Sequence, residues 1–167
     1  MKNRIMLKAK SRITVIHVLE LTGIILFINT TNNIVNRGIY ADVHKTSGAI
    51  PQMDFIVLLV ALLLQVVAIG LFWKVIQGVN QQTKDNFKYK NLLYFTLWTM
   101  VLGGPCMVLI PLVPLFLIAA LVLGITALYL SYDKRNKSKA YVLDCRILNV
   151  MVLFALLVQV TLSFTRT

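Results

Sequence analysis

Acidic residues and histidines are scarce in this chain, and this limits the chemistry available to it. The 167 residues include 6 Asp and Glu and 2 His, against 17 Lys and Arg. Carboxylates and imidazoles supply most acid–base catalysis and much metal ligation. The sequence also contains no His-Glu-x-x-His, no Gly-x-Ser-x-Gly, no P-loop and no dinucleotide-binding glycine pattern. We therefore expect no catalytic activity, no metal site and no cofactor.

Cysteine is equally rare. Cys106 lies within an apolar segment and Cys145 lies in a basic one. The two thiols should therefore sit at different depths, which argues against a disulfide between them. There is no Cys-x-x-Cys pair, so a thiol redox function is not indicated.

Charged residues are missing altogether from long stretches of the chain. Hydrophobic residues make up 58% of it, whereas soluble domains contain about 45–50%. They are gathered into runs, and apolar runs of about 18 residues or more are typical of transmembrane helices. We predict an all-α, polytopic membrane helical bundle that forms one domain over residues 1–167. Five transmembrane helices are expected, at about 13–28, 54–76, 92–109, 113–130 and 147–164, with a polar, turn-rich loop at 29–53 between the first two.

The longest uncharged run, Leu92–Leu130, fixes the topology. It has 39 residues, and as one helix it would be about 58 Å long against a hydrocarbon layer of about 30 Å. The run must therefore fold back, with the turn expected at about 110–114. A helix plus a re-entrant segment is the competing form of this run. For the whole chain, the alternative to five spans is four spans with a last helix that lies on the membrane surface. The residues that break the helix are Gly103, Gly104, Pro105, Pro111 and Pro114.

The basic residues support an even number of crossings in this run. In that case segments 1–12, 74–91 and 131–146 share one side and hold five, four and five basic residues, which is 14 of the 17. With a single crossing the split is ten against seven. Basic residues concentrate on the cytoplasmic side of membrane proteins. We therefore expect location in the cytoplasmic membrane, a basic cytoplasmic tail at 1–12, an external C-terminus and contact with anionic lipid headgroups, but no nucleic-acid partner.

Two polar residues in the first predicted span are the leading functional candidates. His17 and Glu20 are three residues apart, so their side chains lie on the same side of a helix. Glu20 would sit about 10 Å inside the span, where an ionised carboxylate is costly and often marks an ion pathway. The alternative is a structural role, with Glu20 neutral or paired to His17 or to a basic residue of another span.

Three uncharged polar residues lie within other predicted spans. Gln65, Asn149 and Gln159 could line a substrate path. Such residues more often hydrogen-bond between helices, with an effect of roughly 0.6–2 kcal/mol each.

These features favour an accessory or interaction protein of the membrane, including an immunity-type protein that protects against a membrane-active agent. Its partner would be another membrane protein or a second copy of the chain. The alternative is a small transporter or channel-like protein that uses Glu20 and His17. A lipid-handling enzyme is a weaker third hypothesis, because it would need acidic or histidine residues in several spans.

Overall fold

The structure, a computed structural model, describes residues 2–44, 51–82, 87–104, 114–132 and 141–164. Every regular element within these residues is an α-helix, so the all-α prediction is confirmed. The helices are α1 (Lys2–His44), α2 (Gln52–Gln82), α3 (Phe87–Gly103), α5 (Pro114–Tyr132) and α6 (Val142–Phe164).

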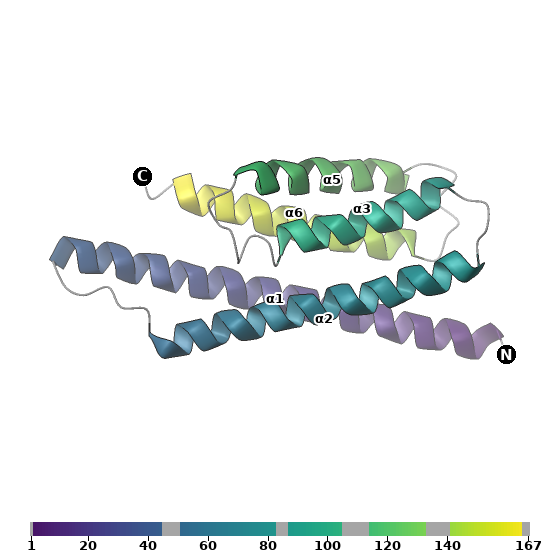
Figure 1. Ribbon diagram of the computed structural model, residues 1–167, viewed down its shortest axis with the longest axis horizontal. Coiled ribbons are helices and arrows are strands. Elements are labelled where there is room, and N and C mark those ends of the chain that lie inside the picture. The colour runs from purple at the N-terminus through teal and green to yellow at the C-terminus, as the bar shows by residue number, and fades with distance from the viewer. Residues whose placement is uncertain (1, 45–50, 83–86, 105–113, 133–140, 165–167) are drawn as a thin grey trace.

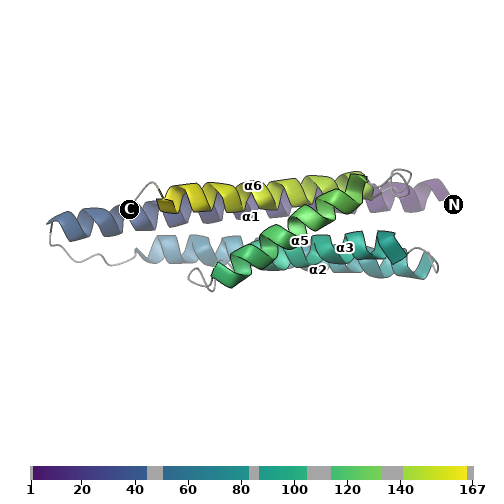
Figure 2. The ribbon, with the colours of Figure 1, turned by 90° about the horizontal axis from the view of Figure 1, so that it is seen from above.

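The five helices form two layers. Each helix runs opposite to the one before it (Figure 1). The long helices α1 and α2 pack along each other in one layer, while α3, α5 and α6 pack together in the other. Contacts of α2 with α3 and of α1 with α6 join the layers. Viewed from above, α5 crosses its neighbours obliquely (Figure 2).

The surface of the described helices is apolar, as lipid contact requires. Large apolar side chains point outward, among them Leu63, Ile118 and Phe154. Four segments are long and apolar enough to cross a membrane: Ile13–Ile39, Gln52–Gly78, Leu115–Tyr132 and Val142–Thr161. The chain is a small polytopic membrane protein with these four candidate spans. The interior is filled by side chains from all five described helices, including Ile16, Phe72, Met100, Ala120 and Leu148.

Helix α3 is not among the four candidate spans. Its 17 residues correspond to about 26 Å, which is less than the hydrocarbon thickness of about 30 Å. It nevertheless packs against α2, α5 and α6 within the bundle. The predicted five spans are therefore supported as four candidate spans and one shorter helix.

The central apolar run does fold back. Helices α3 and α5 lie together and run in opposite directions (Figure 1). Helix α3 ends at Gly103, and the Gly104 N–H donates to the Met100 carbonyl over 3.0 Å. The next residue, Pro105, has no N–H with which to continue the helix. Pro114 is the first residue of α5, where a missing N–H is harmless.

The described part of the third predicted span ends with α3 at Gly103 and the turn residue Gly104, whereas the span was expected to continue to residue 109. Pro105, Pro111 and most of the predicted turn at 110–114 lie outside the described residues.

The predicted polar loop at 29–53 is wrong over most of its length, because α1 continues as helix to His44. Asparagine, threonine and glycine have low helix propensity, and their density after residue 28 suggested a loop. Packing on α2 outweighs that propensity, and Thr30 is buried. An ion pair between Arg37 Nη1 and Asp54 Oδ2, 3.3 Å apart, joins α1 to the first turn of α2.

Other helices also extend beyond the predicted spans. Helix α1 begins at Lys2, so the tail predicted at 1–12 is helical. Helix α2 continues to Gln82, and α6 begins at Val142 instead of 147. The start of α1, the end of α2, the start of α3, the end of α5 and the start of α6 lie at one end of the bundle (Figures 1 and 2). The described parts of the three basic segments therefore share one end, as the charge count predicted.

Candidate functional site

Glu20 points into the centre of the bundle. In an α-helix, side chains three residues apart differ by about 60° around the axis. His17 Nε2 lies 3.4 Å from the Asp144 carbonyl oxygen of α6, whereas Gly23 faces Gln65 of α2. Glu20 lies between these two directions, so it points into the space between α6 and α2. Its side chain is 0% exposed.

The Glu20 carboxyl group has no neutralising partner in the described part of the chain. Neither Oε1 nor Oε2 makes a hydrogen bond there. The predicted pairing with His17 is not made, because the His17 ring contacts the Asp144 backbone instead. Burying an uncompensated carboxylate costs several kcal/mol. The Glu20 carboxyl group is therefore stable at this position only when a proton or another cation neutralises its charge.

Gln65 is the second buried polar residue, and two glycines make room for it. Its side chain is 1% exposed. A Cβ atom at Gly23 would lie 2.8 Å from Gln65 Cγ, and one at Gly104 would lie 3.0 Å from Gln65 Oε1. The amide of Gln65 thus reaches from α2 to the point where α3 ends. Its Oε1 accepts no hydrogen bond from the described residues.

Asn149 joins α6 to α3. Its Nδ2 donates to Thr96 Oγ1 over 2.8 Å and to the Cys145 carbonyl over 2.7 Å. Thr96 Oγ1 in turn donates to the Leu92 carbonyl over 2.8 Å. These contacts match the interhelical role expected of such residues. The Asn149 Oδ1 atom, however, is buried without a partner among the described residues.

The remaining predicted residues lie elsewhere. Gln159 is half-buried on α6, ten residues beyond Asn149 and so about 15 Å further along the helix. Gly103 is a packing position, because an added Cβ would collide with Val152 of α6. Pro114 begins α5.

Sequence reasoning overlooked Gly23 and Thr96, which position the polar side chains. Gly23 could have been found as a small residue one turn after Glu20 in an apolar span. No feature of the sequence singled out Thr96, since the hydroxyl group of a threonine in a span ordinarily hydrogen-bonds to a carbonyl of its own helix. Only the packing of α3 on α6 brings it to Asn149.

The interior therefore contains buried acceptor oxygens from three helices that have no donor among the described residues: both carboxyl oxygens of Glu20, Gln65 Oε1 and Asn149 Oδ1. Oxygen acceptors suit a proton or a hard cation. Among the described residues, no group of three or more His, Cys, Asp or Glu side chains could hold a metal ion.

Comparison with known proteins adds no family to this description. No family model matches the chain, and no curated protein or solved structure is similar to it.

Proposed function

We propose that this membrane protein transports protons or monovalent cations, and that the Glu20 carboxyl group binds and releases the ion. The observation that supports the proposal is the burial of both Glu20 oxygens without a hydrogen-bond partner in the described residues. Ionisable residues inside a membrane are costly, and they typically mark ion or proton pathways. A carboxyl group retained in such a place is better suited to taking up a cation than to holding helices together.

The C-terminal end of α3 adds further oxygen atoms to the proposed ion site around Glu20. The last carbonyl groups of a helix have no partner within it, and the C-terminal end carries a partial negative charge. Gln65 Oε1 lies beside this end, next to Gly104. Helix ends and unwound carbonyls coordinate cations in many transporters. Glu20 would supply the charge, while Gln65 and the end of α3 would supply neutral oxygens.

The test is a flux measurement on protein reconstituted into sealed vesicles that contain a pH-sensitive dye. A potassium diffusion potential drives cation entry, and the wild-type protein should acidify the interior or carry a monovalent cation inward. Glu20→Gln keeps the shape of the side chain but removes its charge, so it should abolish the flux. Asp54→Asn is the matched control, since it removes a carboxylate outside the interior site. Absence of wild-type flux, or full flux in Glu20→Gln, would refute the proposal.

A second candidate is an accessory or interaction protein, including an immunity-type protein. The described parts of the three basic segments lie at one end of the bundle, which supports it. That end would offer a cationic surface to an acidic partner or to anionic lipid, and its charge also favours a cytoplasmic orientation. Cross-linking in the native membrane should then capture one defined partner. Loss of that partner after Lys84, Lys88 and Lys90 are changed to glutamine, with Glu20→Gln unaffected, would distinguish this function from transport.

A further inference from the structure

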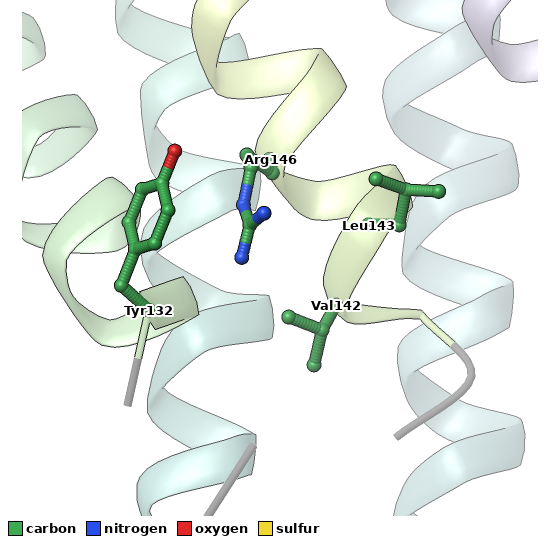
Figure 3. Close-up of a pocket in the computed structure, with 4 residues that line it drawn as sticks. All are labelled: Tyr132, Val142, Leu143 and Arg146. Carbon is green, nitrogen blue, oxygen red and sulfur yellow. The ribbon is translucent and has the colours of Figure 1, made fainter. Parts of the chain in front are cut away.

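A cavity of about 410 Å³ lies where α5 ends and α6 begins. Its walls are Tyr132, Val142, Leu143 and Arg146. In Figure 3 the guanidinium group of Arg146 extends between the Tyr132 ring and the side chains of Val142 and Leu143. This volume is within the range of about 300–1,000 Å³ that is typical of small-molecule sites. None of the described residues that line the cavity belongs to the Glu20 site, so the inference is independent of the proposed transport function.

The guanidinium group is held in a fixed position. Arg146 Nε donates to Ser131 Oγ over 3.2 Å, and Nη2 donates to the Ser131 carbonyl over 3.0 Å. Ser131 is fully buried, and its Oγ donates to the Leu128 carbonyl over 2.7 Å. The Tyr132 ring lies beneath the guanidinium group, with 4.0 Å from Arg146 Cζ to the ring centroid. A guanidinium group fixed in this way loses little freedom when it binds a ligand.

Part of the binding capacity of Arg146 is unused. A guanidinium group has five N–H donors, and the contacts with Ser131 employ two of them. Within the described residues Arg146 forms no ion pair with an acidic side chain. Its charge and its three remaining donors are therefore available to an anion in the cavity. Planar donors of this kind match the geometry of phosphate oxygens.

The location of the cavity identifies the kind of anion. Tyr132 and Val142 are the end residues of two candidate spans, so the cavity lies at the level of lipid headgroups. Leu143 is 60% exposed and presents an apolar wall beside the charge. The segment 131–146 carries five basic and two acidic residues, which favours anionic lipid at this surface. We propose that this cavity binds the phosphate group of an anionic phospholipid, with Arg146 as its main ligand.

Binding can be measured by native mass spectrometry of the full-length protein in detergent, with phosphatidylglycerol and inorganic phosphate as separate probes. Leu143→Trp fills the cavity without touching the contacts between Arg146 and Ser131. It should weaken phosphatidylglycerol binding by at least about tenfold. Leu157→Trp is the matched control on the same helix, with 62% exposure against 60%, and it should bind like the wild type. Arg146→Lys keeps the charge but loses the planar donors, so it should also bind at least about tenfold more weakly.

The two probes distinguish the sources of the phosphate group. Stronger binding of phosphatidylglycerol to wild type than to Leu143→Trp, with no effect of inorganic phosphate, supports a lipid site. If inorganic phosphate alone separates wild type from Leu143→Trp, the cavity binds a soluble phosphate compound and the lipid assignment is wrong. If neither probe separates these two proteins, the cavity is not a phosphate site.

Discussion

Replacing Glu20 by methionine should make the protein more stable. The carboxyl group is 0% exposed, and neither oxygen has a hydrogen-bond partner in the described residues. Leaving a buried polar group unsatisfied costs about 1–3 kcal/mol. Methionine has a similar length, adapts to irregular interiors and carries no group that needs a donor. We therefore expect Glu20→Met to raise the free energy of unfolding by about 1–3 kcal/mol.

The measurement is reversible unfolding in mixed micelles of mild detergent and SDS, followed by circular dichroism or tryptophan fluorescence. In the unfolded state α1 separates from the bundle and the Glu20 side chain regains contact with water, so its burial contributes to the measured difference. Ile16→Ala is the control for sensitivity. Ile16 is fully buried four residues earlier on α1, and its truncation should lower the free energy of unfolding by about 2–5 kcal/mol.

One result would refute this reasoning. If Glu20→Met lowers the free energy of unfolding by more than about 1 kcal/mol, the carboxyl group has a stabilising partner and its role is structural. A stabilised variant that has lost ion flux would instead identify Glu20 as a residue retained for function at the expense of stability.

Two further predictions concern packing and topology. Gly103→Ala should lower the free energy of unfolding by about 1–3 kcal/mol, because its Cβ would collide with the stiff Val152 side chain. Adding Val152→Ala should recover part of that loss in the same unfolding assay, and strictly additive effects would contradict the contact. Gly38 of α1 follows Arg37, which pairs with Asp54 at the start of α2, whereas Gly78 lies near the end of α2, and both glycines face open space. In a protein without native cysteines, Gly38→Cys and Gly78→Cys should react with a membrane-impermeant maleimide from opposite sides. Reaction of both from one side would rule out a membrane-spanning α2.

The same labelling experiment could not use Cys145, although this residue lies in a basic segment of the sequence. The side chain is 0% exposed, because α6 begins at Val142 and turns this position toward the interior. Basic composition indicated which end of the bundle the residue is near. It did not indicate the direction of the side chain, which depends on where the helix starts.

Segment 29–44 shows where sequence patterns are weakest. Its asparagine and threonine residues have low helix propensity, so a loop was predicted. The segment is helical because α1 lies along α2, a contact between residues distant in sequence. Local preferences of a few tenths of a kcal/mol per residue are readily outweighed by such packing.

The sequence alone determined that this is a helical membrane protein, that the central apolar run reverses direction and that the basic segments lie at one end. These properties follow from chain length, proline chemistry and the cost of placing charge in lipid, none of which depends on which helices touch. Tertiary structure decided the rest. It directed His17 to the backbone of α6, left Glu20 buried without a partner in the described residues, and brought Gln65 to the end of α3. Those outcomes depend on how the helices are rotated against one another, and that rotation is set by contacts between residues far apart in the chain.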